Sequence, residues 1–384
     1  MSDTPLPRDA FPVVDGWVYL NHAGVSPLPA PAVDAMAAYA ARAASDGGEA
    51  WRENETLEAD VRARAGRLMG VDGADVAFVP NTSAGLALVV NGLEWAEGDR
   101  VVVPACEFPS NLYPWLALTH RGVEVVRVEP AGPGERLPVE AFERVLSGGA
   151  RVLALSWAQF GRGWRSDLAA IGALCRDHGV LFVVDAIQGV GLMPAAFAEW
   201  GVGVAAADGY KWMLGPEGAG VAYVSPAARE QLRVSAPGWN SVSHRADFDR
   251  RDPVLDPTAR RYEPGTLNDA GLHGLGASLA LLETAGVDAI WAHVDRLCLA
   301  LIEGLEAAGA EVLTDRRDGG GSGIVTFRHP GMEPDRLADE LVTRRFSVRA
   351  RGGGVRAAPH GYNTFDEIEA FAAAVGEVTG ATSA

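Results

Sequence analysis

From about residue 75 onwards, short apolar runs alternate with amphipathic stretches. The apolar runs have the length of buried strands, whereas 109–120 and 167–178 have the spacing of amphipathic helices. Apolar strands separated by helices are typical of a mainly parallel sheet that is covered on both faces. Ligands in such folds bind beyond the carboxyl ends of the strands, so we examined the residues that follow each strand for chemistry. The seven predicted strands are 75–79, 100–103, 123–128, 152–156, 180–185, 202–206 and 220–225.

The flanking segments follow other patterns. Before this region, 17–20 predicts a short strand, and helical spacing predicts one helix that ends near Gly47 and a second after Trp51. After it, 235–264 is irregular and predicts a long loop. We therefore expect an N-terminal arm and helix (1–50), a large α/β domain (51–265) and a smaller α+β C-terminal domain (266–384). In the last part we expect helices at 271–282, 290–308, 334–344 and 365–375, strands at 311–313, 323–328 and 347–349, and loops at the glycine runs 319–321 and 352–354.

Composition narrows the class of protein. The 384 residues carry a formal net charge of −17, which argues against non-specific binding to nucleic acids or anionic membranes. Cys106, Cys175 and Cys298 show no paired spacing, so we expect neither a disulfide framework nor a cysteine-based metal site, and a reducing cytoplasm fits best. The N-terminal residues do not resemble a secretory signal, and no apolar run is long enough to span a membrane.

Lys211 is the only lysine in a chain whose other basic residues are all arginine. Arginine stays protonated, whereas lysine can lose its proton and form an imine with a carbonyl group. Lys211 lies between Tyr210 and Trp212, ahead of a Gly-Pro turn. These neighbours disfavour the alternative of a solvated surface lysine. An imine-forming lysine serves either pyridoxal phosphate or a carbonyl substrate.

Pyridoxal phosphate requires a carboxylate that keeps its pyridinium nitrogen protonated. Asp185 ends the most apolar strand, where a buried charge is costly unless it is paired. The alternative is a helix cap, which Gly189 and Gly191 make less favourable because they follow so soon. Gln188 could donate to the phenolic oxygen of the cofactor, although by itself it could equally be a surface residue.

The cofactor phosphate and a substrate carboxylate also require partners. Thr82 and Ser83 follow a strand and open a helix, which is a ready site for an anion. A plain helix cap would explain these residues equally well. Arg356 could bind a carboxylate with two parallel hydrogen bonds, but nothing local distinguishes it from a surface arginine.

Taken together, these motifs resemble the class V aminotransferases, in particular their cysteine desulfurase-like branch. The resemblance covers almost the whole chain, from Tyr19-Leu20-Asn21-His22-Ala23 through Asp185-Ala186-Ile187-Gln188 and Gly209-Tyr210-Lys211-Trp212 to Glu263-Pro264-Gly265-Thr266 and Arg356. It implies a fold-type I enzyme dependent on pyridoxal 5′-phosphate. The implied roles are Lys211 as the catalytic lysine bound to the cofactor, Asp185 and Gln188 as ring contacts, Thr82, Ser83, Asp208 and Tyr210 as further cofactor contacts, Arg356 as the ligand of the substrate carboxylate, and Thr266 as a residue that reaches the partner's phosphate in a homodimer.

Three positions depart from the desulfurase pattern. The loop before Arg356, residues 349–355, contains no cysteine, although desulfurases of this branch carry their nucleophilic cysteine there. Phe108 replaces the histidine that stacks on the cofactor, so it can stack but cannot move a proton. Tyr210 replaces a phosphate-binding histidine. This variant looks more like the isopenicillin-N-epimerase-like group.

From these departures we predict an aminotransferase or a β-eliminating C–S lyase acting on an amino acid, and not a persulfide-forming cysteine desulfurase. An epimerase is the alternative, and a non-catalytic binding protein with this fold is the second. The predicted partners are a small amino-acid substrate and a second copy of the chain. Further predicted substrate contacts are His22, Gln159, Trp239 and Asn240.

Overall fold

A seven-stranded sheet forms the centre of the computed structural model, which describes residues 4–132 and 134–380 apart from the side chain of Glu53. The strand order is β2-β8-β7-β6-β5-β3-β4, and only β8 runs antiparallel to its neighbours within this described sheet. This confirms the predicted mainly parallel α/β fold. The strands are β2 (Val76–Val79), β3 (Arg100–Pro104), β4 (Glu124–Val128), β5 (Val152–Ser156), β6 (Leu181–Asp185), β7 (Val204–Asp208) and β8 (Gly220–Val224).

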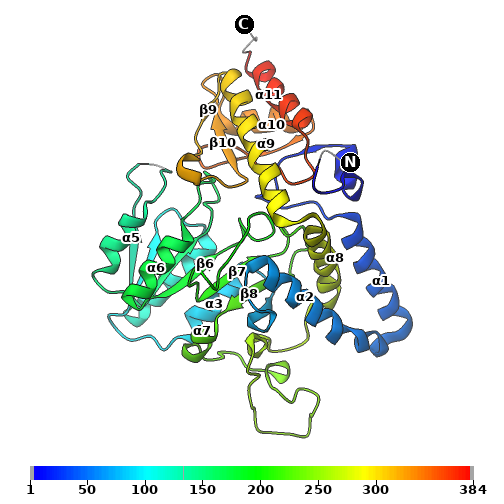
Figure 1. The fold of residues 1–384 in the computed structure, drawn as a ribbon, viewed down its shortest axis with the longest axis vertical. Helices are drawn as coiled ribbons and strands as arrows, with labels where there is room; N and C mark the ends of the chain where they lie inside the picture. The colour runs from blue at the N-terminus through cyan, green and yellow to red at the C-terminus, as the bar shows by residue number, and fades with distance from the viewer. Residues whose placement is uncertain (1–3, 133, 381–384) are drawn as a thin grey trace.

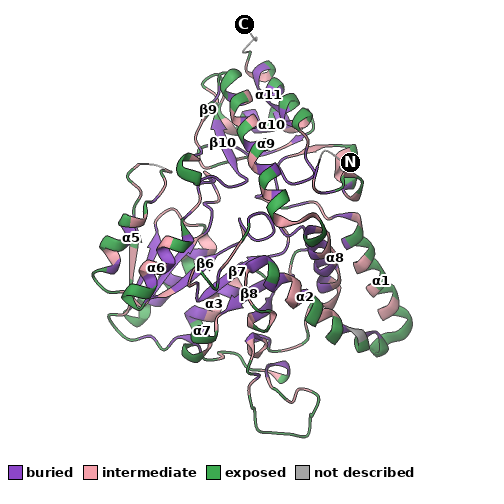
Figure 2. Cartoon of the chain, viewed as in Figure 1, coloured by how far each residue is buried: buried purple, intermediate pink, exposed green. Residues whose placement is uncertain are grey.

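Alternate residues of each central strand contribute to two separate cores. Leu153 and Phe182 pack on one face of the sheet, whereas Ala154 and Val183 pack on the other. Because successive strand residues point to opposite faces, a strand buried on both sides must be apolar throughout. Figure 2 shows this continuous burial along β6, β7 and β8. Because both faces of the sheet are covered, successive residues are all buried, and the sequence contains nearly unbroken apolar runs.

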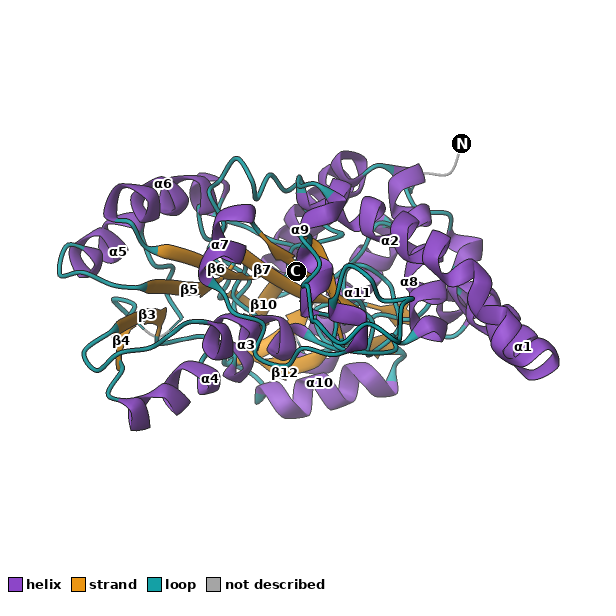
Figure 3. Ribbon diagram, turned by 90° about the horizontal axis from the view of Figure 1, so that it is seen from below, coloured by secondary structure: helices purple, strands orange, loops and turns teal. Residues whose placement is uncertain are grey.

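Helices cover both faces of the sheet. In Figure 3, α5 and α6 lie on one side of the strands, and α3 and α4 lie on the other. The expected helix at 109–120 is instead broken into short pieces around α4, where Pro114 removes a backbone donor. The helices of this region are α2 (Asn54–Met69), α3 (Thr82–Gly92), α4 (Tyr113–Leu116), α5 (Val139–Leu146), α6 (Leu168–His178) and α7 (Pro226–Gln231).

A smaller antiparallel sheet with the order β12-β13-β10-β9 lies at the C-terminal end, with helices against it (Figure 1). The glycine run at 352–354 was predicted as a loop, but Gly352 and Gly353 form the tight turn of a hairpin and Gly354 begins β13. Both turn residues have positive φ, which glycine adopts without strain. The elements are α8 (Asp269–Ala285), α9 (Val287–Ala307), β9 (Glu311–Val312), β10 (Val325–Arg328), α10 (Pro334–Thr343), β11 (Phe346–Ser347), β12 (Arg349–Arg351), β13 (Gly354–Ala357) and α11 (Phe365–Thr379).

The N-terminal arm is attached to residues near the end of the chain. Strand β1 (Val18–Tyr19) pairs in parallel with β11, and Phe11 stacks on Tyr362 with the ring centroids 4.0 Å apart. Helix α1 (Ala30–Asp46) follows and packs against α8. The proposed division at residues 50 and 265 stays a prediction.

No single helix in the described residues is long and apolar enough to cross a membrane. Helices α8 and α9 together meet the length and composition of a span, but they bend by 79° at their junction. The apolar sides of both helices belong to the main core.

Candidate active site

A cavity opens at the carboxyl edge of the central sheet. Fourteen of the described residues line it. The residues come from the ends of β2, β5, β6 and β7 and from the loop after β3, as expected for this fold. They are Asn81, Thr82, Ser83, Phe108, Ser110, Ser156, Ala158, Phe160, Asp185, Ile187, Gln188, Asp208, Tyr210 and Lys211.

A strained turn presents Lys211 to this cavity. The turn follows β7, and Leu214 adopts a left-handed conformation with φ of 57°, which is rare for a residue with a branched side chain. The Leu214 N–H donates to the Lys211 carbonyl (3.0 Å), and the Ser278 hydroxyl of α8 donates to the Leu214 carbonyl (2.6 Å). Helix α8 therefore holds the turn that places the only lysine.

The Lys211 ammonium is deeply buried. Its side chain extends between Phe108 and Tyr210, with Nζ 5.9 Å and 5.6 Å from the two ring centroids. Burial lowers the pKa of Lys211 to about 8, although the negative charge of Asp185 opposes this shift. A larger fraction of the amine is therefore neutral, and so nucleophilic, near physiological pH than for an exposed lysine.

This lowered pKa gives a pH-dependent prediction. We expect the rate at which the apoprotein captures pyridoxal phosphate covalently to rise with pH and to level off above about pH 8, because only the neutral amine attacks an aldehyde. Stopped-flow absorbance over a pH series would measure the midpoint, with Lys211→Arg as the control that cannot react. A midpoint near the ordinary lysine value would contradict the buried setting.

Asp185 lies beneath the same cavity at the end of β6. It is 3% exposed, and its Oδ1 accepts a hydrogen bond from the Ile187 N–H (3.1 Å). Burial raises the pKa of Asp185 to about 6, whereas that backbone bond and the charge of Lys211 lower it. Gln188 donates to the Ala23 carbonyl (3.0 Å) and accepts from the Trp212 indole (2.8 Å), which fixes the side-chain amide at the cavity wall.

Hydroxyl and backbone donors gather at the start of α3. The Asn81 side chain caps the helix by accepting from the Ala84 N–H, and the Ser83 hydroxyl donates to the Ser110 hydroxyl (2.8 Å). The Thr82 hydroxyl accepts from the backbone N–H of Asp208 (3.1 Å), which joins this helix end to β7. The arrangement suits a phosphate group.

The entrance of the cavity is aromatic and acidic. The rings of Phe108 and Phe160 meet edge to face with centroids 5.2 Å apart, and Phe108 remains 43% exposed. Asp208 accepts from the Gly209 N–H (2.7 Å), and burial raises its pKa to about 6. Burial also raises the pKa of Tyr210.

Arg356 is a buried cation that lacks an acidic partner among the described residues. It is 4% exposed on β13, donates to the Phe160 carbonyl (2.7 Å), and approaches Asn21 Oδ1 at 3.5 Å. Its Nε has no hydrogen-bond partner in the described part of the chain, and burial lowers the pKa of Arg356 to about 10. A buried guanidinium without an anion is costly, so this position fits a carboxylate ligand.

Arg356 and five further predicted residues are not among those that line this cavity. Both ring nitrogens of His22 are within hydrogen-bond distance of protein groups, the Ala358 carbonyl and the Tyr362 hydroxyl. The Gln159 amide holds the turn beside Phe160 through Cys106, Gly161 and Arg162. Trp239 and Thr266 are exposed, and Asn240 contacts the backbone of Gly265.

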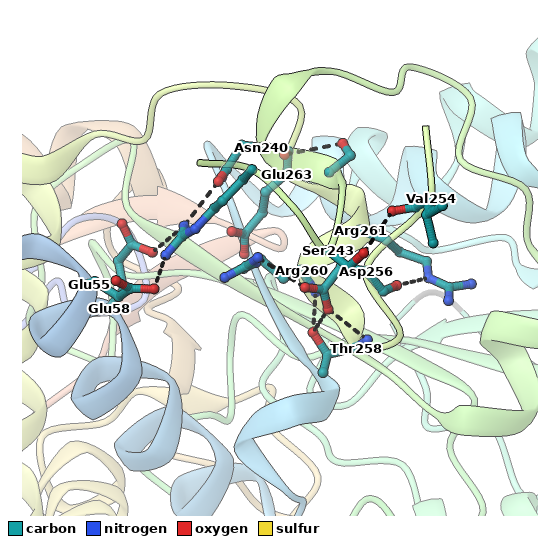
Figure 4. Close-up of polar contacts among 12 residues, drawn as sticks. Glu55, Glu58, Asn240, Ser243, Val254, Asp256, Thr258, Arg260, Arg261 and Glu263 are labelled. Carbon is teal, nitrogen blue, oxygen red and sulfur yellow. Dashed lines mark hydrogen bonds and ion pairs between the residues drawn. The ribbon is translucent and has the colours of Figure 1, made fainter. Parts of the chain in front are cut away.

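A network of charges anchors the long loop that carries Trp239 and Asn240 (Figure 4). Arg245 joins Asn240 to Glu55 and Glu58 of α2. At the other end of the loop, buried Glu263 accepts two hydrogen bonds from Arg62 (2.5 and 2.7 Å) and one from the Phe78 N–H (2.7 Å). The segment that leads to Thr266 is therefore fixed to α2 and β2.

The sequence analysis missed several wall residues. Asn81, Ser110, Ser156 and Phe160 line the cavity without having been assigned a role. Ser156 could have been found, because it is a polar residue at the end of a predicted apolar strand. Phe160 carried no local signal, since its place follows from the turn that Gln159 holds.

Comparisons with known proteins identify the family and confirm the fold. The model of the aminotransferase class-V family matches residues 18–371. A protein of Methanothermobacter thermautotrophicus named a probable cysteine desulfurase is 30% identical over 97% of both chains. The apo structure of a cysteine desulfurase from Thermococcus onnurineus is 25% identical and covers both chains completely with a TM-score of 0.89. The fold also matches a C-DES variant with glycine linked to its pyridoxal-phosphate cofactor (23% identity, TM-score 0.90, covering 97% of this chain and 99% of that one).

These relatives overturn one prediction. We expected a protein that is not a persulfide-forming cysteine desulfurase, but chains similar over their whole length carry that name. The prediction relied on the missing cysteine at 349–355. Such a cysteine receives the sulfur, so its absence does not exclude cleavage of a carbon–sulfur bond. Of the three cysteines, Cys175 and Cys298 lie in the core, and burial raises the pKa of half-buried Cys106 to about 12.

Proposed function

Because the chain belongs to the aminotransferase class-V family, whose enzymes depend on pyridoxal 5′-phosphate, we propose that it removes sulfur from cysteine or a closely related amino acid. The observation that carries the proposal is that Lys211 and Asp185 face one cavity. Arg356 is a buried cation without an acidic partner among the described residues, and its positive charge lowers the pKa of Lys211. The choice of a sulfur amino acid rests on the relatives named cysteine desulfurases.

The residues around the cavity fit the cofactor. When bound, pyridoxal phosphate supplies an aldehyde that captures an amine and a ring that accepts electrons from a bond broken at the substrate Cα. Asp185 would accept the hydrogen bond of the pyridinium nitrogen, and its burial makes such a cationic partner favourable. Thr82, Ser83 and the start of α3 would bind the phosphate.

The remaining roles follow from charge and shape. Lys211 would hold the cofactor and, once released, accept the proton of the substrate Cα, for which a pKa of about 8 is well matched. Arg356 would orient the substrate by its carboxylate. Phe108 would cover the cofactor ring and keep water from it, with Tyr210 beside it at the entrance.

Homodimer formation is part of the proposal. Thr266 is exposed, lies outside the cavity of its own chain, and follows a segment that Glu263 fixes in place. These features support a role for Thr266 at the phosphate of a second copy. Trp239 and Phe248 expose apolar surface on the same loop, which fits burial by that copy. Three cysteines without a disulfide support a cytoplasmic setting.

Product analysis tests the proposed reaction. With cysteine and dithiothreitol as the thiol acceptor, we expect alanine and released sulfide in equal amounts. One thiol takes the sulfur as a persulfide while Cβ gains a proton in its place, and the second thiol then displaces sulfide as dithiothreitol closes to its cyclic disulfide. Alanine and sulfide would be measured together, with serine as the control substrate that lacks sulfur. Transfer of an amino group to a keto acid without release of sulfide would contradict the proposal.

The role of Arg356 gives a separate prediction. Arg356→Gln is expected to raise KM for cysteine by about 10-fold or more with a smaller change in kcat, because a charge-assisted bond worth about 1.5–3 kcal/mol is lost. The matched control is Arg349→Gln, since Arg349 pairs with Arg356 across β12 and β13 but is exposed. Steady-state kinetics would decide, and an unchanged KM would assign the carboxylate to another residue.

A further inference from the structure

A carboxyl group that the proposed function does not use lies behind the cavity wall. Glu107 follows β3, and its Oε1 accepts a hydrogen bond from the backbone N–H of Ser156 (2.7 Å), while its Oε2 is hydrogen-bonded to the Ser156 hydroxyl. Ser156 pairs in register with Asp185, so the last residues of β5 and β6 lie side by side. Both of them line the cavity. Ser156 therefore connects Glu107 to the place where the cofactor ring would lie.

Glu107 and Asp185 form a pair of neighbouring acids, of which Asp185 is buried and Glu107 partly buried. Burial raises the pKa of Glu107 to about 7; Ser156 opposes this shift and the negative charge of Asp185 adds to it. Burial raises the pKa of Asp185 only to about 6, because Lys211 and the Ile187 N–H oppose it. The other titratable neighbour is the Cys106 thiol, whose pKa burial and Glu107 raise. The Lys211 charge favours the ionised form of Asp185, whereas the Asp185 charge disfavours the ionised form of Glu107, so the first proton goes to Glu107 as pH falls.

We propose that Glu107 is a positioning residue that holds the proton of this pair near neutral pH, so that Asp185 stays ionised for the cofactor ring. The protonation state of Glu107 also sets the direction in which the Ser156 hydroxyl hydrogen points. Ionised Glu107 accepts the Ser156 hydroxyl hydrogen and turns it away from the cavity. Protonated Glu107 donates from Oε2 to Ser156 Oγ, which frees that hydrogen to turn toward the cavity. The inference rests on the part of the proposed function that places the ring at Asp185, and it does not depend on the substrate.

The test is a pH titration of the holoenzyme followed by circular dichroism of the cofactor band, divided by its absorbance so that the amount of absorbing species cancels. We expect a transition with a midpoint near pH 7 in the wild type. Glu107→Gln, which keeps the shape but stays neutral, is expected to retain the low-pH signal and lose that transition. Glu129→Gln is the matched control, because Glu129 is an exposed acid whose negative charge also raises the pKa of Cys106. A normal transition in Glu107→Gln overturns the proposal.

A second variant keeps the test decisive if Glu107→Gln does not fold. Ser156→Ala removes the hydroxyl through which Glu107 reaches the cavity, so the neutral transition of the cofactor band is expected to disappear. A normal transition in Ser156→Ala, or the absence of any neutral transition in the wild type, overturns the proposal. Failure of the desulfurase reaction would leave this titration in place, because the readout follows the bound cofactor and not turnover.

Discussion

Replacing Lys211 with alanine is expected to lower kcat by about 10³-fold or more while the chain keeps its fold and still binds pyridoxal phosphate without a covalent link. No other lysine can take its place, because the sequence contains none. The groups that would hold the phosphate (Thr82 and Ser83 on α3) and the ring (Asp185 on β6) lie outside the turn that carries Lys211 and remain in place. Absorbance of the bound cofactor would show whether the covalent link is present. Equilibrium dialysis would measure cofactor binding, and steady-state kinetics would measure kcat.

Two controls separate chemistry from packing in this experiment. Lys211→Arg keeps a cation in the pocket and is expected to be equally inactive, since a guanidinium does not lose its proton. Small primary amines added to Lys211→Ala are expected to restore part of the rate by accepting the Cα proton. Full activity of Lys211→Ala would contradict the assignment of Lys211 as the proton acceptor.

Replacing Glu263 with alanine is expected to destabilise the protein by about 3–5 kcal/mol, because it leaves the largely buried Arg62 guanidinium without its bidentate partner and the Phe78 N–H without its acceptor. Exposed ion pairs contribute about 0–1 kcal/mol, so Glu55→Ala, which breaks an exposed contact with Arg245, is the matched control. Urea denaturation of both variants would measure the difference. Equal midpoints for the two variants would contradict the importance of this buried pair.

A double replacement refines this second prediction. Arg62→Met combined with Glu263→Leu removes both charges and fills the space with apolar groups, so it is expected to be less destabilising than Glu263→Ala alone. Because Glu263 fixes the segment that ends at Thr266, we also expect Glu263→Ala to weaken association between copies. A Glu263→Ala protein with normal stability and normal self-association would show that the loop is held by other contacts.

Much of the large sheet was predictable because its signal is local. A strand buried on both faces is apolar at nearly every position, and β5 and β6 are apolar up to their last residues, Ser156 and Asp185. The same logic located Asp185, since a carboxylate at the end of such a strand needs a partner. The hairpin of β12 and β13 was missed, because consecutive glycines at 352–354 indicate a loop unless their partner strand is known.

The parts of the site that depend on distant contacts were not predictable. The Arg356 guanidinium donates to the Phe160 carbonyl, 196 residues away along the chain, and no local pattern encodes that contact. His22 looked like a substrate ligand because it lies in a recognisable motif, yet its nitrogens contact Ala358 and Tyr362. Sequence patterns identify residues able to do chemistry, whereas the tertiary fold decides which of them face the cavity.

The pairing of the N-terminal arm with residues near the C-terminus has a consequence for synthesis on the ribosome. The Arg8 guanidinium donates to the Tyr362 carbonyl, 354 residues later, and β1 pairs with β11. The arm is made 354 residues before the carbonyl that Arg8 binds, so Leu6 and Phe11 keep their apolar surfaces uncovered until Gly361 and Tyr362 have emerged from the ribosome. Domains generally fold as they emerge, and here docking of the arm comes after synthesis of both domains of the fold that lie between these residues.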